Sequence, residues 1–177
     1  MEKPATGEKD FSEQTPVEKM ADMQKCLKHE PIRLSVALHE AGHVVYALRA
    51  SATDMKYHGP TEHPDFPGTY GMAGVIIPVF PTGDGAIVEL IAMARWYCAG
   101  GVVKSVLSPH LWTDDEDFTD HVIYVQEAAK FESVTVEGIH GVWKRAQQDV
   151  ERDLRSPAFR KQLWELAREV EKKIPWS

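Results

Sequence analysis

The pentapeptide H-E-A-G-H at residues 39–43 places two histidines four positions apart. On an α-helix this spacing puts both side chains on one face, where their imidazole nitrogens can bind a single metal ion. Zinc is the usual metal of the H-E-x-x-H pattern, and the glutamate within it is positioned to take a proton from a water on that metal. The pattern therefore predicts one zinc per chain on His39 and His43, with Glu40 as general base, which is the chemistry of a peptide-bond hydrolase.

The residues around the pentapeptide predict a buried helix from about Ile32 to Ala50. Pro31 is suited to the first turn of a helix, and apolar side chains cover most of the surface that follows. Histidines and a glutamate buried in such a helix need partners, which a metal ion supplies. Gly42 lowers helix stability, so its presence there predicts a close approach by another element.

Composition narrows the class of protein. A chain of 177 residues with 43 % hydrophobic content can form one domain with a real core, and we expect it over residues 15–177, after a disordered leader at 1–14. The net charge of −7 and the lack of a basic cluster argue against nucleic-acid binding.

The location is predicted to be cytoplasmic. Cys26 and Cys98 form no C-x-x-C pair or disulfide framework, and the polar N-terminus does not look like a signal peptide. The longest apolar stretch, residues 86–103, is interrupted by Glu89, Arg95 and two glycines, so no membrane segment is expected.

The rest of the pattern predicts a mostly α fold (α+β), with a small β-hairpin or sheet beside the zinc site. Strands are expected at residues 53–58 and 70–80, on either side of a proline-rich loop at 59–68. Polar residues in and beside this loop (His58, Glu62, His63 and Asp65) are possible ligands, but they are interpreted as mostly solvated. Further helices are expected at 15–28, 85–107, from 114 onward, at 135–154 and from 156 onward.

A zinc site needs a third protein ligand. Tyr46 and Arg49 stand where the metzincin pattern requires glycine and histidine, which excludes that class. Glu89 is the candidate for a thermolysin-like arrangement. The helix that begins near Asp114 offers further acids: Asp114 and Asp115 suit its solvated first turn, Glu116 suits a capping box with Thr113, and Asp117 borders an inner face expected to carry Phe118, Val122, Val125 and Ala129.

The pentapeptide, running on into Val44-Val45, resembles the protease domain of the FtsH-type ATP-dependent zinc metalloproteases. Three later segments stand where that family has its glycine-rich helix end, its ligand aspartate and its substrate-edge strand: Ala99–Lys104, Asp117–His121 and Gly71–Val75. The resemblance implies that Asp117 is the third zinc ligand. It also implies that Gly71, Met72, Ala73, Gly74 and Val75 bind an extended peptide along a strand edge.

The chain departs from the family at several positions. Gly101 and Lys104 replace an arginine and a glutamate, and His121 replaces a small residue. No phosphate-binding loop is present, so the chain has no ATPase module of its own.

The predicted function is therefore that of a zinc-dependent endopeptidase acting on peptides or unfolded protein. A separate ATPase or adaptor is a compatible partner, as is assembly into an oligomer. The alternative is a non-catalytic, protease-like domain that binds a partner protein with a structural metal or none. Glu40 argues against that alternative, because a purely structural metal needs no base.

Overall fold

The computed structural model describes residues 14–53, 55–62, 70–71, 74–76, 86–111, 114–131 and 134–176. Six α-helices, one 3-10 turn and four short strands are found within them. In chain order these are α1 (Pro16–Cys26), α2 (Glu30–Arg49), β1 (Lys56–His58), β2 (Thr61–Glu62), β3 (Tyr70–Gly71), β4 (Gly74–Ile76), α3 (Ala86–Leu107), η2 (Pro109–Leu111), α4 (Asp114–Ala128), α5 (Val136–Asp153) and α6 (Pro157–Lys173). The predicted fold class, mostly α with a small β element, is confirmed, whereas the expected leader at 1–14 falls almost wholly outside the described residues.

Local capping residues set several of the helix starts. Thr15 and Glu18 form a reciprocal capping box in which each side chain accepts a hydrogen bond from the other residue's backbone N–H. Thr135 and Ser156 accept from the backbone of Gly138 and Phe159 in the same way. These starts lie within two residues of the positions that the sequence predicts.

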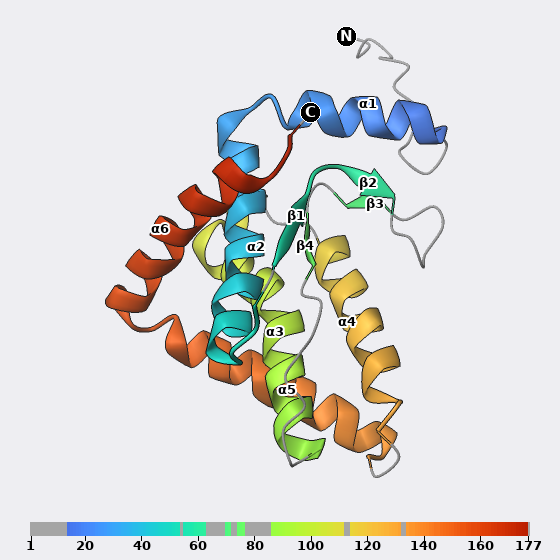
Figure 1. The fold of residues 1–177 in the computed structure, drawn as a ribbon, viewed down its shortest axis with the longest axis vertical. Helices are drawn as coiled ribbons and strands as arrows, with labels where there is room; N and C mark the ends of the chain where they lie inside the picture. Colours follow the sequence, from blue (N-terminus) through green and yellow to red (C-terminus); the bar gives the residue numbers. More distant parts are fainter. Residues whose placement is uncertain are drawn as a thin grey trace, which may run out of the picture.

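Helix α2 forms the centre of the molecule. Every residue from Ser35 to Ala47 is buried, and α2 packs against α3 and α6 along much of its length. Helix α5 packs on α3, and α4 packs on α3 from another side (Figure 1). A helix buried on all sides is what its nearly continuous apolar sequence predicts.

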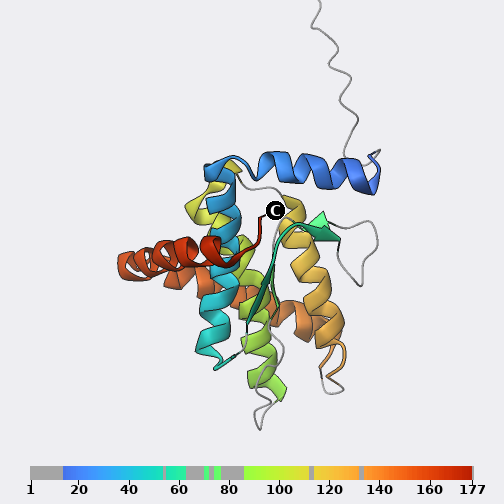
Figure 2. The ribbon, with the colours of Figure 1, turned by 45° about the horizontal axis from the view of Figure 1, so that its top comes forward.

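The strands form a narrow antiparallel ribbon between α2 and α4. β1 pairs with β4, and β2 pairs with β3. Two views of the ribbon agree on its position between the two helices (Figures 1 and 2), and β4 contacts α2. The loop predicted at 59–68 thus contains a strand, β2, because pairing with β3 satisfies backbone groups there despite the nearby prolines.

Helix α3 is apolar enough, over Val88–Leu107, to cross a membrane by length and composition alone. It packs against α2, α4 and α5, half of that stretch is buried, and Cys98 in its middle is fully buried. The core helix of a soluble protein meets the same criteria. Neither Cys26 nor Cys98 forms a disulfide bond.

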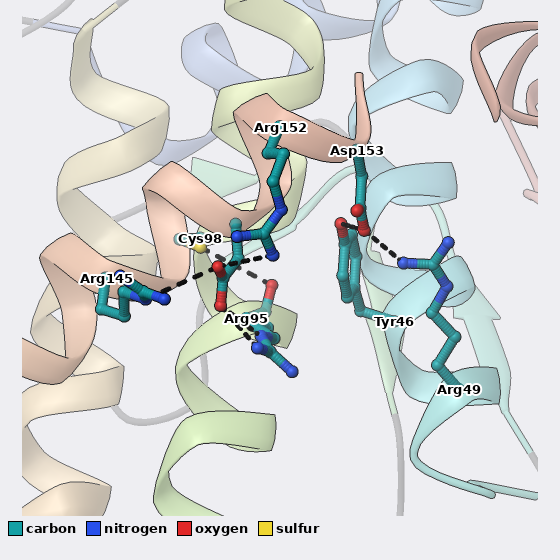
Figure 3. Close-up of polar contacts among 8 residues, drawn as sticks. Tyr46, Arg49, Arg95, Cys98, Arg145, Arg152 and Asp153 are labelled. Atoms are coloured by element: carbon teal, nitrogen blue, oxygen red, sulfur yellow. Dashed lines mark hydrogen bonds and ion pairs between the residues drawn. The ribbon is translucent and has the colours of Figure 1, made fainter. Parts of the chain in front are cut away.

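A buried carboxylate ties α5 to α3. Asp149 is 3 % exposed and accepts hydrogen bonds from Nε and Nη2 of Arg95, at 3.1 and 2.5 Å. Arg152 and Arg145 approach its other oxygen at 2.7 and 3.6 Å (Figure 3). Beside this cluster, Asp153 accepts from Tyr46 and Arg49, which ties α5 to α2.

Candidate metal centre

Two glycines bring the histidine pair against the backbone of α3. A Cβ on Gly42 would lie 2.7 Å from the carbonyl oxygen of Ala99, so α2 and α3 touch at that point. A Cβ on Gly100 would overlap His43 Nε2 and lie 2.7 Å from His39 Nε2. The close approach predicted at Gly42 is confirmed, and Gly100 provides the space in which the two ring nitrogens meet.

A backbone hydrogen bond sets the tautomer of His43. Its Nδ1 lies 2.8 Å from the carbonyl oxygen of Trp96. Because a carbonyl only accepts, Nδ1 carries the proton, and the lone pair of the neutral ring is on Nε2. His43 Nε2 lies 2.9 Å from His39 Nε2, so both rings direct the same nitrogen to one point.

Asp120 on α4 completes the cluster. Its Oδ2 lies 3.5 Å from His39 Nε2 and 3.3 Å from His43 Nε2, and the three ligand atoms all lie within 4.8 Å of one another. A tetrahedral zinc with bonds of about 2.0–2.1 Å separates its ligand atoms by roughly 3.3 Å. The two Asp120 spacings are close to that value and longer than charged hydrogen bonds, which are about 2.7–2.9 Å long, whereas the 2.9 Å between the two histidine nitrogens is shorter than the separation on an ion.

The cluster is strongly coupled by charge. Burial alone would lower the pKa of His43, but the charge and hydrogen bond of Asp120 outweigh it and raise the pKa to about 9. The pKa of His39 is also raised: burial would lower it, but the hydrogen bond to Asp120 and the charges of Glu40 and Asp120 outweigh that effect. For Asp120, burial would raise the pKa, yet the two histidines hold it well below its usual value. Two basic rings and an ionised carboxylate form a donor set that binds either protons or a divalent cation.

Glu40 lies beside the cluster without belonging to it. The side chain is 5 % exposed, and its Oε1 is 4.0 Å from His39 Nε2. Burial raises the pKa of Glu40, and the charges of His39 and His43 oppose that rise. A carboxylate with a raised pKa next to a metal position is a stronger base than an exposed one, which suits proton transfer.

The third residue of the described cluster is Asp120, and the predicted Asp117 is not tested by it. Asp117 belongs to α4, but its side chain lies outside the described residues, as do those of Asp114 and Asp115, so its ligand role stays a prediction. Glu89 is not in the described cluster: it lies eleven residues before Gly100 on α3, about 16 Å along the helix axis.

Asp120 was missed because the inner face of α4 was predicted only in part: Val125 packs against the core, as expected, but two of the other predicted positions do not. Phe118 is 68 % exposed and Ala129 is also exposed, whereas Tyr124 and Ala128 are fully buried. Asp120, Tyr124 and Ala128 follow one another at intervals of four, which places them on one face. That spacing was visible in the sequence, but it required an aspartate to be counted as a buried residue.

The predicted substrate edge is only partly described. Gly71 closes β3, and Gly74 and Val75 open β4, whereas Met72 and Ala73 lie outside the described residues. β4 pairs with β1 on one side, and among the described residues its other edge has no strand partner. Of the polar residues of the neighbouring loop, His63 and Asp65 are not described, Glu62 is exposed on β2, and His58 ends β1.

Comparison of the chain with known proteins found no matching protein family, no matching curated protein and no matching solved structure. The resemblance to the FtsH-type proteases therefore rests on the residues already named.

Proposed function

We propose that this protein is a zinc-dependent endopeptidase in which His39, His43 and Asp120 hold the metal and Glu40 is the general base. The observation that supports it most is the convergence of three possible ligand atoms from two helices beside a buried glutamate. A purely structural site needs no base at that position. Zinc in such a site lowers the pKa of its water to about 7 and polarises a carbonyl oxygen.

The chain's own residues then have separate tasks. Trp96 orients His43 through its backbone carbonyl, and Gly100 leaves room for both rings. Glu40 accepts the proton of the attacking water and later delivers it to the leaving nitrogen, so its own protonation state is restored. The free edge of β4 is proposed to align an extended peptide beside the site.

Peptides and unfolded segments are the proposed substrates, since an extended chain is what a strand edge can hold. A separate ATPase that unfolds proteins, and assembly into an oligomer, remain proposals from the family resemblance. So do a cytoplasmic location and the lack of nucleic-acid binding, which follow from composition.

Substitution of Glu40 tests the activity directly. Zinc content by elemental analysis should be about one per chain in both the parent and Glu40→Gln, because the glutamate is not a ligand. Hydrolysis of a quenched peptide library should fall by about 10²–10⁴-fold in the variant. Equal cleavage by parent and variant would remove Glu40 from the mechanism, and a zinc-loaded parent without any peptidase activity would favour the partner-binding alternative.

The third ligand is tested by a matched pair on α4. Asp120→Ala should lower zinc affinity by orders of magnitude, because it removes one of three protein ligands. Asp117→Ala, one helical turn earlier, should keep most of the affinity. Competition against a zinc-binding dye measures both, and the reverse result would restore Asp117 to the role implied by the family resemblance.

A further inference from the structure

His58 is a half-buried histidine outside the proposed zinc ligands. It is the last residue of β1 and stands opposite Gly74 of β4. Residues directly opposite each other in an antiparallel pair project to the same face. His58 and Gly74 therefore share one face of the ribbon, and Tyr57 and Val75 share the other, which packs against the core.

The His58 ring occupies the space that a side chain at position 74 would need. A Cβ on Gly74 would overlap His58 Nε2 and lie only 2.5 Å from Cε1. The packing of His58 thus requires a glycine at position 74, since any larger residue would displace the imidazole. The ring edge that carries Nε2 lies over β4, the strand proposed to align the substrate.

The other ring nitrogen is already engaged. His58 Nδ1 lies 3.0 Å from the carbonyl oxygen of Gly59 and therefore donates to it. Gly59 is itself packed against the backbone of Pro175, which leaves no room for a Cβ. His58 is thus held from two sides, and Nε2 is the nitrogen left to interact with a ligand.

The strand under the His58 ring contacts the helix that carries the base, since β4 packs against α2. Burial raises the pKa of Glu40, and three histidines oppose this rise: His39, His43 and, more weakly, His58. His58 is the one of the three that belongs to the strand ribbon, which lies between α2 and α4 (Figure 1). The charge of His58 therefore acts on Glu40 from the ribbon, the element proposed to hold the substrate.

We propose that His58 is a further catalytic residue, whose Nε2–H donates a hydrogen bond to the carbonyl oxygen of the peptide bond under attack. This inference rests on the proposed peptidase function. Since Nδ1 donates to Gly59, both ring nitrogens carry a proton when Nε2 donates. As the water oxygen bonds to the carbonyl carbon, the π electrons move to the carbonyl oxygen, and His58 stabilises that charge while keeping its proton. The proton of the water passes to Glu40 and then to the leaving nitrogen.

The test compares His58→Phe, which keeps an aromatic ring over Gly74, with His58→Gln, which restores an N–H donor. Zinc content and circular dichroism should match the parent in both. Loss of one donor to a developing oxyanion typically lowers kcat by about 10²–10³-fold, so we expect about a 100-fold lower kcat for His58→Phe, an unchanged KM and partial recovery in His58→Gln. The exposed His110 supplies the control, since His110→Phe should behave as the parent.

A second measurement does not depend on turnover. A phosphinic pseudopeptide carries an anionic oxygen on a tetrahedral phosphorus in place of the scissile carbonyl. Calorimetric titration of the zinc-loaded proteins should show about 100-fold weaker binding by His58→Phe than by the parent and His110→Phe. Equal phosphinate affinities in parent and His58→Phe would overturn the role of His58.

The two proposals fail separately. A parent that binds the phosphinate but cleaves no peptide would refute the endopeptidase, while the affinities would still decide on His58. A parent that cleaves peptides as fast as its His58→Phe variant would refute only the role of His58. A parent that neither binds nor cleaves would overturn both.

Discussion

At the residue scale, two glycines shape this site as much as the histidines do. Gly100 faces both ring nitrogens of the histidine pair, and Gly74 faces the ring of His58. In each case the missing Cβ is the space in which an imidazole lies. A substitution that adds one methyl group therefore reports on the geometry of the site without removing any ligand.

Gly100→Ala should weaken zinc binding by about 10–100-fold, the usual cost of disturbing the surroundings of a metal ligand. The added Cβ would displace His39 and His43, both of which are buried and cannot move outward freely. Gly141→Ala on α5 is the matched control, because no atom lies within 4 Å of its added Cβ. Dye competition measures both affinities, and a Gly100→Ala protein that binds zinc like the parent would contradict the site geometry.

At the residue scale, the sequence singled out His39, Glu40 and His43 but not Asp120, the third residue of the described cluster. His39, Glu40 and His43 fall within five consecutive residues on one helix, so helical spacing alone brings them together. Asp120 lies 81 positions after His39, and its burial depends on partners from another helix. Apolar periodicity assigns Phe118 to the inside and Asp120 to the outside, because it contains no information about compensating charges.

At the scale of elements, α2 and α3 approach each other closely beside the histidine cluster. Gly42 faces the backbone of Ala99 and Gly100 rather than flexible side chains. Backbone atoms cannot rotate away as a side chain can, so the two helices must separate if position 42 is enlarged.

Gly42→Ala should therefore lower the free energy of unfolding by about 1–3 kcal/mol, the usual cost of overpacking. Gly141→Ala should raise it by about 0.5–1 kcal/mol, since it replaces an uncrowded glycine within a helix. Urea unfolding of the parent and both variants measures the difference. Opposite signs for two identical substitutions would establish that the α2–α3 contact, rather than helix propensity, decides the outcome at position 42.

The elements themselves were largely predictable, because long helices with capping residues carry strong local signals. The strand ribbon was less predictable from the sequence. β3 and β4 divide the single strand predicted at 70–80, and β2 lies where a loop was expected. Strands of two or three residues owe their existence to pairing partners, which are set by the whole chain rather than by the segment. For the same reason, the pairing of His58 with Gly74 could not be predicted from the local sequence.

At the scale of the whole molecule, the arginine cluster around Asp149 makes stability depend on pH. The hydrogen bonds and charge of Arg95, with Arg152 and Arg145, hold the pKa of Asp149 below its usual value. A carboxyl group whose pKa is lower in the folded than in the unfolded chain stabilises the fold above the unfolded pKa of about 3.9, and this contribution is lost as the pH falls through and below that value.

The free energy of unfolding should therefore fall between pH 5 and pH 3 more steeply in the parent than in Asp149→Asn. Both proteins are compared with EDTA present, so that loss of metal does not contribute to the difference. Urea unfolding at several pH values gives the two slopes. Parallel slopes would mean that Asp149 is not preferentially ionised in the folded chain.

The position of Asp120 also bears on the conformational entropy of the unfolded chain. Helix α4 packs mainly on α3 and only slightly on α5, while the histidines belong to the central helix. An ion shared by His39 and Asp120 closes a loop of 81 residues, as a covalent cross-link would, in a protein whose described cysteines form none. This cross-link is reversible, so the supply of zinc would set not only the activity of the protein but also its lifetime among other proteases.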